Sequence, residues 1–326
     1  MINISSKIIL GTWQFGGDVW TNVTEKNSIA TIFKALESGI NTIDTAIEYG
    51  DGHSERVIGK AIRDISGDIP RESVKIYTKV FANMLSPDKV IESCNKSLEN
   101  LNTDYLDLFQ IHWPAGSFGT EIIPISETLS AFNQLKSEGK IKAIGISNFN
   151  VNQIKEAIKY AQIDTLQPSY SLFWRHIEHE IYPLCLENNI KVLAYSPLAQ
   201  GLLTGKFKDN KSFVTGDNRN YNKKFQSPHF ERALGALDKL QVYADKYNCS
   251  LAHLSLAWLM HQKDVYPVVG ARLPEQIHQV SKSMDIKLDL KDVTAIDEIG
   301  MLVAEHFLHD SKTHYFEDDW ESLKGS

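Results

Sequence analysis

Several residues that can exchange protons stand at the ends of short β-branched, apolar runs of the sequence. Asp44 lies at the end of NTIDT, and Lys79 lies near the end of KIYTKV. His112 ends DLFQIH, and Tyr49 follows Asp44 by five residues. An ionisable residue in an apolar strand is costly unless it is paired, and Asp44 and Lys79 could pair with each other. Together these groups could transfer a proton and stabilise developing negative charge.

Each of these residues also has an ordinary structural explanation. Asp44 and Lys79 could form a buried salt bridge without a catalytic role. His112 could be a histidine of the core, and Tyr49 could be a packing residue with a bonded hydroxyl. The combination is harder to explain by packing alone, because the four groups stand at or near the ends of three consecutive predicted strands. We therefore predict that they converge on one site.

The elements that must position these residues alternate along the chain, with apolar runs that predict strands and amphipathic segments between them that predict helices. The strands are expected at 8–12, 41–45, 75–80, 107–112, 142–147, 165–168, 191–195 and 265–269. The helices are expected at 25–38, 54–64, 87–100, 126–138, 150–161, 177–188, 230–262 (long enough for two) and 274–283.

This alternation predicts an α/β fold, a (β/α)8 TIM barrel that forms a single domain over residues 1–326. A doubly wound open sheet is the alternative. It would usually carry G-x-G-x-x-G after its first strand, whereas the first strand here runs into GTWQFGG. Because the carboxyl ends of barrel strands line one mouth, the barrel also brings the polar residues at these ends together.

Three stretches are expected to lie outside the regular units. Segments 113–125 and 200–230 have little periodicity and predict active-site loops over one end of the barrel. Segment 304–326 is acidic and aromatic, and it predicts a C-terminal tail that either folds over the barrel mouth or stays mobile.

Composition argues against several classes of protein. No apolar run reaches 18 residues, so no membrane span is expected, and the net charge of −7 disfavours nucleic acid as a partner. The N-terminal segment lacks the features of a signal peptide, and the cysteines are three and widely separated. A cytoplasmic protein without disulfides is therefore expected. No metal site is predicted.

Seven segments of the sequence, taken in order, resemble the aldo-keto reductase family. The segment IDTAIEYGDGHSERVIGKAI is similar to the family's D-T-A-x-x-Y motif and to the S-E-x-x-x-G helix after it. The segments that follow in the family's order are YTKV, IHWP, GKIKAIGISNF, LQPSYS, YSPLAQGLLTGK and VGARLPEQ. The segment YSPLAQGLLTGK resembles most closely the bacterial members and the potassium-channel β-subunit branch.

The resemblance implies a catalytic tetrad of Asp44, Tyr49, Lys79 and His112, and the residue types agree with it. Reduction of a carbonyl requires a hydride on carbon and a proton on oxygen. A phenol has an ordinary pKa of about 10, and a cation such as Lys79 beside Tyr49 is expected to lower that pKa. Tyr49 is then the general acid in reduction and the base in oxidation. His112 would orient the carbonyl oxygen.

The resemblance also implies a cofactor that lies extended across the barrel mouth, with NADPH favoured and NADH not excluded. Strand ends would hold the nicotinamide, the segment after 195 would cover the pyrophosphate, and the helix that begins at Pro274 would meet the 2′-phosphate and adenine. The residues assigned to the cofactor are Gly11, Thr12, Trp13, Asp44, Ser147, Asn148, Gln167, Tyr195, Ser196, Leu198, Gly201, Lys206, Gly270, Arg272 and Gln276.

Two positions depart from common family patterns. Gln279-Val280 stands where many members have Glu-Asn, and Val280 cannot bond adenine as that Asn does. Gly270-Ala271 stands where some branches have Lys-Ser for the 2′-phosphate. Arg272 is the remaining candidate for this phosphate, although it could also be a solvated surface charge.

The substrate pocket is expected to be aromatic, because large rings stand near the predicted strand ends. The candidates are Trp20, Phe81, Trp113 and Trp174, which suit an aldehyde, a sugar face or an aromatic ketone. The predicted activity is reversible, NADPH-dependent reduction of an aldehyde or ketone, with sugars among the candidate substrates, by a monomer or homo-oligomer. The alternatives are a cofactor-binding regulatory subunit with slow turnover and a barrel enzyme of different chemistry, such as a phosphosugar isomerase.

Overall fold

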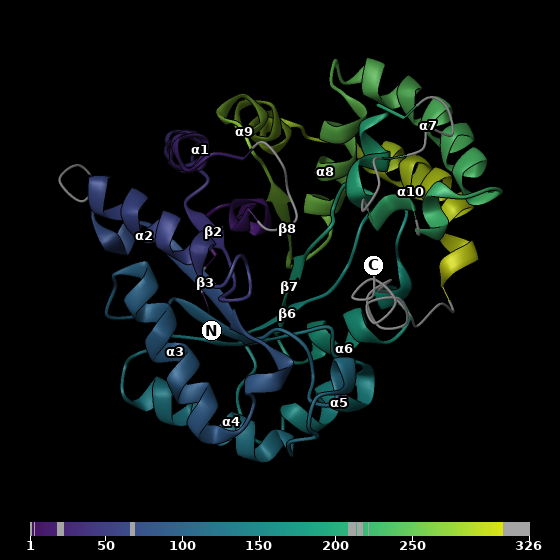
Figure 1. The fold of residues 1–326 in the computed structure, drawn as a ribbon. Helices are drawn as coiled ribbons and strands as arrows, with labels where there is room; N and C mark the ends of the chain where they lie inside the picture. The colour runs from purple at the N-terminus through teal and green to yellow at the C-terminus, as the bar shows by residue number, and fades with distance from the viewer. Residues whose placement is uncertain are drawn as a thin grey trace.

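The strands of the computed structural model form a closed parallel barrel (Figure 1). The structure describes residues 2, 4–17, 23–65, 69–207, 213, 218–220 and 222–308. Within these residues the strands are Ile9–Gly11 (β1), Thr42–Asp44 (β2), Lys75–Val80 (β3), Leu108–Ile111 (β4), Ile144–Ser147 (β5), Thr165–Gln167 (β6), Lys191–Ala194 (β7) and Val265–Gly270 (β8). Each coincides with a predicted strand to within a few residues. Because β8 pairs with β1, the TIM barrel is confirmed and the open sheet is excluded.

Helices surround the barrel on its outside (Figure 1). Their bounds are Glu25–Glu37 (α1), His53–Ile65 (α2), Pro87–Leu101 (α3), Ile125–Ser137 (α4), Val151–Ala157 (α5), Ile181–Glu187 (α6), His229–Lys246 (α7), Leu251–His261 (α8), Pro274–Ser281 (α9) and Leu290–Ala304 (α10). The sequence analysis does not predict α10, which packs on α7. Its Val293, Ile296 and Val303 recur at helical spacing and would have indicated it.

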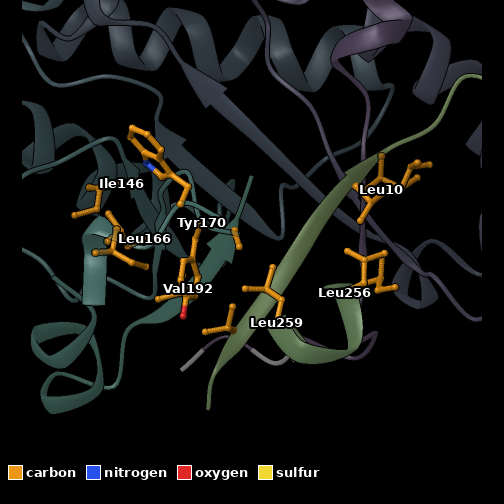
Figure 2. Close-up of a cluster of buried hydrophobic side chains, with 14 of the residues drawn as sticks. Leu10, Ile146, Leu166, Tyr170, Val192, Leu256 and Leu259 are labelled. Carbon is orange, nitrogen blue, oxygen red and sulfur yellow. The ribbon is translucent and has the colours of Figure 1, made fainter. Parts of the chain in front are cut away.

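The barrel wall separates two apolar clusters, because successive side chains of a strand point to opposite sides. One cluster contains Ile9, Tyr77, Leu108, Leu193 and Val268, which alternate along their strands with outward-facing residues, and Ala143, which directly precedes β5. The larger cluster lies between strands and helices. Figure 2 shows part of it, in which Leu10, Leu166 and Val192 of the strands share one cluster with Leu256 and Leu259 of α8.

The segments predicted as loops are described in part. Segment 113–125 is irregular except for a short 3-10 turn at Ser117–Gly119 and its last residue, which begins α4. Segment 200–230 contains part of another 3-10 turn, Ala199–Thr204, and the start of α7. The predicted tail begins with a turn at Glu305–Phe307, while residues 309–326 lie outside the described residues. None of the described helices has both the length and the apolar character of a membrane span.

Candidate active site

A buried lysine joins the polar groups at the carboxyl ends of β2 and β3. Lys79 Nζ donates to Asp44 Oδ1 at 2.6 Å and to the carbonyl oxygen of Thr45 at 2.7 Å. It also donates to the Tyr49 hydroxyl at 3.3 Å. Lys79 is fully buried and Asp44 is 2% exposed, so this charge pair has little contact with water. The predicted pairing of Asp44 with Lys79 is therefore present, and the turn between β2 and α2 brings Tyr49 to it.

His112 packs against the Tyr49 ring. It directly follows β4, and its ring centroid is 5.9 Å from that of Tyr49, with the two rings nearly perpendicular. The Phe81 ring also packs edge-on against His112, at 5.7 Å. The four residues predicted to converge thus meet at one end of the barrel. A phenol that lies close to both an ammonium group and an imidazole can donate a proton to a carbonyl oxygen bound beside it.

The pKa of Tyr49 differs from the expectation that Lys79 lowers it, and the pKa of Lys79 is shifted as well. Burial raises the pKa of Tyr49 above its ordinary value, and the charge of Asp44 adds to this, while Lys79 opposes it. The expected lowering by Lys79 is thus present, but it does not prevail. For Lys79, burial alone disfavours the ammonium form, but the charge of Asp44 and the interactions with Asp44 and Tyr49 outweigh burial and raise its pKa. At neutral pH the site therefore holds a protonated phenol beside a protonated lysine.

The second oxygen of Asp44 is held by two amides. Gln110 Nε2 donates to Asp44 Oδ2 at 3.2 Å, and Gln167 Nε2 donates to the same atom at 2.8 Å. Gln110 is not among the residues predicted from the sequence. The alternation of β4 would have indicated it, because Gln110 is two residues before His112 and so lies on the same side of the strand.

The residues predicted to hold the nicotinamide form a hydrogen-bonded chain. The Ser147 hydroxyl donates to the carbonyl oxygen of Gln167 at 2.7 Å. Asn148 Nδ2 donates to Ser147 Oγ and to the His112 carbonyl oxygen, both at 3.0 Å. The Tyr195 hydroxyl donates to Asn148 Oδ1 at 3.0 Å. These amide and hydroxyl groups at neighbouring strand ends are the kind that a carboxamide requires, and they are linked directly to His112.

The residues predicted at the end of β1 connect it to β2. Gly11 pairs with Asp44 on one side and with Gly270 on the other. The backbone N–H and the side-chain hydroxyl of Thr12 both donate to the Asp44 carbonyl oxygen, at 3.0 Å each. Trp13 begins the 3-10 turn that follows, at Trp13–Gly16. Thr12 thus fixes the backbone that carries Asp44.

The segment after β7 departs from ordinary backbone conformations. Ser196, Ala199 and Gln200 have φ values of 51°, 48° and 55°, and Gly201 has a φ of 96°. A left-handed conformation costs a residue other than glycine about 1–2 kcal/mol, and such conformations cluster at ligand sites. Of the other residues predicted in this segment, Leu198 is half-buried and Lys206 is exposed. The strain suits a segment that presents backbone N–H groups, as the sequence predicts.

The residues after β8 make a cap for α9. Gln276 Oε1 accepts hydrogen bonds from the backbone N–H groups of Arg272 and Leu273, at 2.7 and 3.2 Å. Gln276 is predicted to meet adenine, but its side-chain carbonyl oxygen is bonded to the backbone of its own chain. Arg272 itself is exposed. Val280, at the position that departs from the family, packs against the apolar core.

The predicted substrate residues lie in different surroundings. Phe81 stacks on Phe118 at 5.5 Å, and Trp113 meets the same ring edge-on at 5.0 Å, so both lie near His112. Phe118 is a further aromatic candidate that the sequence analysis does not single out, although it lies in a predicted active-site loop. Trp174 is only 1% exposed, with the Lys224 ammonium 3.7 Å from its ring centroid.

Two further predictions concern Trp20 and metal ions. Trp20, also predicted to contact substrate, lies outside the described residues. Across the part of the chain that the structure describes, no three His, Cys, Asp or Glu side chains are grouped so as to hold a metal ion.

The chain is similar in sequence and in structure to several known proteins. The model of the aldo/keto reductase family matches residues 7–301. An NADH-specific methylglyoxal reductase of Escherichia coli (strain K12) is 35% identical over 317 residues, which cover 90% of this chain and 94% of that protein. The structure of the glycerol dehydrogenase AKR11B4 from Gluconobacter oxydans matches with a TM-score of 0.84 and 34% identity, over 95% of this chain and 94% of that one.

A further structural match was solved with a cofactor. It is an aldo-keto reductase from Klebsiella pneumoniae in complex with NADPH, with a TM-score of 0.70 and 28% identity over 90% of each chain.

Proposed function

The chain belongs to the aldo/keto reductase family of oxidoreductases, and we propose that it catalyses the reversible reduction of an aldehyde or ketone to an alcohol with NADPH. One observation carries the proposal. Lys79 Nζ lies between Asp44, at 2.6 Å, and the Tyr49 hydroxyl, at 3.3 Å. This is an arrangement for giving a proton to a carbonyl oxygen and stabilising the phenolate that remains.

The proposed roles follow from charge. Because burial raises the pKa of Tyr49, its phenol carries a proton at neutral pH and can act as general acid in reduction. Lys79 stabilises the phenolate left behind, and Asp44 holds Lys79 in place. His112, against the Tyr49 ring, orients the carbonyl oxygen and donates to the negative charge that develops on it. In the oxidative direction the phenolate accepts the proton of the alcohol.

The chain of amides and hydroxyls at the strand ends fits a nicotinamide cofactor. Ser147, Asn148 and Gln167 would hold the carboxamide, the Tyr195 ring would lie against the nicotinamide, and Arg272 would meet a 2′-phosphate. When bound, the cofactor supplies the hydride, and the protein supplies position and electrostatic field. The relative solved with NADPH supports this choice, whereas the relative named as NADH-specific makes the choice of coenzyme a point to test.

The activity can be tested by following loss of reduced nicotinamide with a panel of aldehydes and ketones. The relatives suggest methylglyoxal as one substrate, and glycerol oxidation with NADP⁺ as the reverse assay. Tyr49→Phe is expected to lower kcat by about 10²–10⁴-fold, the usual contribution of a general acid. Binding of NADPH, followed by quenching of tryptophan fluorescence, should change little.

The matched control is Tyr160→Phe, which removes a hydroxyl from an exposed tyrosine and should leave kcat unchanged. Wild-type turnover by Tyr49→Phe would show that the acid is another group. Tight cofactor binding by the wild type without turnover on any carbonyl compound would favour the regulatory alternative.

The coenzyme preference can be tested at Arg272. Removal of a charge that meets a phosphate weakens NADPH binding but not NADH binding, so Arg272→Ala should lower the ratio of kcat/KM for NADPH to that for NADH about tenfold or more. Lys239→Ala, at an exposed lysine on α7, is the control and should leave the ratio unchanged. An unchanged ratio in Arg272→Ala would remove Arg272 from the 2′-phosphate site.

A further inference from the structure

A glutamine occupies the interior of the barrel below the predicted tetrad. Gln110 is fully buried, and its place in β4 alternates with the outward-facing Phe109 and Ile111. Its Nε2 donates to Asp44 Oδ2 at 3.2 Å. Its Oε1 has no hydrogen-bond partner among the described residues. A buried amide with one end unsatisfied is unfavourable compared with an apolar side chain, so packing does not explain this residue.

The neighbouring strand leaves space for this amide. Gly145 of β5 is in register with Gln110. A Cβ atom at Gly145 would lie 2.7 Å from Gln110 Cγ and 2.4 Å from the hydroxyl oxygen of Thr165. Both contacts are shorter than side chains tolerate. The interior therefore accommodates Gln110 in its present position only because residue 145 has no side chain.

We propose that Gln110 is a positioning residue for proton transfer: its amide holds one oxygen of Asp44, so that the other oxygen stays on Lys79 and Lys79 stays on the Tyr49 hydroxyl. This inference rests on the proposed reductase function, because the chain of contacts ends at the proposed acid. It assigns Gln110 no contact with substrate or cofactor.

Gln167 binds the same carboxylate oxygen, but its position differs. It ends β6, where it is also a candidate for the nicotinamide carboxamide, and a cofactor contact there would compete with its bond to Asp44 at 2.8 Å. Gln110 lies inside β4, two residues before His112, and it is not a candidate for a cofactor contact. It is the donor expected to remain on Asp44 throughout turnover.

The consequence for Tyr49 follows from the charges around it. The ionisable groups that face the cluster are Lys79, Asp44, His112 and, from the barrel interior, Tyr77. The positive charge of Lys79 lowers the pKa of Tyr49, and the negative charge of Asp44 raises it. A donor on Asp44 disperses the negative charge. Without this donor the pKa of Tyr49 should rise further, and the phenol should become a weaker acid.

The first test is Gln110→Met, which keeps an unbranched side chain of similar length and removes the amide. Loss of one hydrogen bond to a charged group predicts that kcat falls about 10–100-fold. KM for the carbonyl compound and the dissociation constant of NADPH should stay within about twofold of wild type, because no contact with either ligand is lost. The alkaline limb of the pH profile for reduction should move to higher pH.

A second variant keeps the shape and changes only the donor. The carboxyl introduced by Gln110→Glu can donate to Asp44 while it is protonated, and it repels Asp44 once it is ionised. Activity close to wild type is expected at the acidic end of the pH range, with a loss at higher pH that wild type does not show. Because ionisation of a buried carboxyl also destabilises the fold, circular dichroism measured at each pH separates a folding defect from a loss of activity in the folded enzyme.

A readout without turnover separates this inference from the proposed function. The ¹³Cζ resonance of Tyr49, assigned by its loss in Tyr49→Phe, should titrate at higher pH in Gln110→Met than in wild type, whether or not any carbonyl compound is reduced. An inactive wild type would contradict the proposed function only. An unmoved Tyr49 resonance, or a lower kcat with an unmoved alkaline limb, would overturn the role of Gln110.

Discussion

At the scale of single residues, the proposed acid is a half-buried phenol beside a fully buried lysine. Burial raises the pKa of Tyr49, and the fully buried Lys79 opposes this with its charge. Two charges taken out of water attract each other strongly, but they gain little net stability because both lose hydration. The pair of Lys79 and Asp44 is therefore better explained by the proposed proton transfer than by stability, and removal of both charges should lower activity much more than stability.

The variant Lys79→Met tests this balance. It leaves the Asp44 charge buried without its partner, which should cost about 3–5 kcal/mol in the free energy of unfolding measured with urea. It also removes the cation that favours phenolate, so kcat should fall and the alkaline limb of the residual reduction should move to higher pH. The sign follows from Lys79, because its charge lowers the pKa of Tyr49.

The double variant Asp44→Asn with Lys79→Met is the control for this prediction. It removes both charges and should recover much of the lost stability without recovering activity. A single variant as stable as wild type would mean that water or another group compensates Asp44.

At the scale of elements, the position of Tyr49 depends on a turn packed against the 3-10 turn after β1. Gly50 follows Tyr49 with a φ of 65°, and a Cβ atom there would lie 2.1 Å from the Gly16 carbonyl oxygen. The turn that carries the proposed acid can therefore approach Trp13–Gly16 only through glycine. The position of the phenol is set by this backbone contact as well as by Lys79.

The variants Gly50→Ala and Gly39→Ala separate the effect of a steric clash with Gly16 from the effect of an unfavourable backbone conformation. Gly39 after α1 has a similar φ of 77°, but a Cβ there meets nothing within 4 Å. Gly39→Ala should lower stability by about 1 kcal/mol and leave kcat unchanged. Gly50→Ala should also move Tyr49, and a displacement of about 1 Å predicts a loss of about 10²-fold in kcat. Equal kcat values for the two variants would contradict the role of the turn.

At the scale of the whole molecule, the two ends of the barrel carry polar residues for different purposes. At the amino ends of the strands, Asp107 before β4 accepts a hydrogen bond from the Ile76 backbone N–H and another from Arg71, both at 3.1 Å. Asp164 before β6 accepts one from the Ile144 backbone N–H in the same way. These carboxylates join neighbouring strands, whereas Asp44 at the carboxyl end holds a lysine beside the proposed acid.

The division predicts that Asp107→Ala lowers stability without lowering activity. Loss of a buried carboxylate that binds Arg71 and a strand N–H should cost about 3 kcal/mol in urea unfolding. The kcat of the folded fraction should stay unchanged, because the far end of a TIM barrel carries its active site. Asp238→Ala, at an exposed position on α7, should change neither quantity. A loss of kcat in Asp107→Ala would show that the two ends are coupled.

The sequence by itself determined the order of the strands and of most helices, and it favoured a barrel in which Asp44, Lys79 and His112 meet, whereas the pairing of β8 with β1 excluded the open sheet. These follow from local periodicity and from one geometric rule, that parallel barrel strands end at a common mouth. Helix α10 has the same kind of local signal in its apolar spacing, although the sequence analysis does not use it.

Only the tertiary structure decided the net direction of the Tyr49 pKa, the bond of Gln110 to Asp44, the cap made by Gln276 and the burial of Trp174. Three of these four depend on groups far apart in the chain. For example, the Lys224 ammonium lies over the Trp174 ring. Gln276 caps its own helix, yet its residue type fits an adenine contact equally well. The burial of a side chain and its hydrogen-bond partners depend on which residues surround it in space, so they cannot be predicted from residue types and spacing alone.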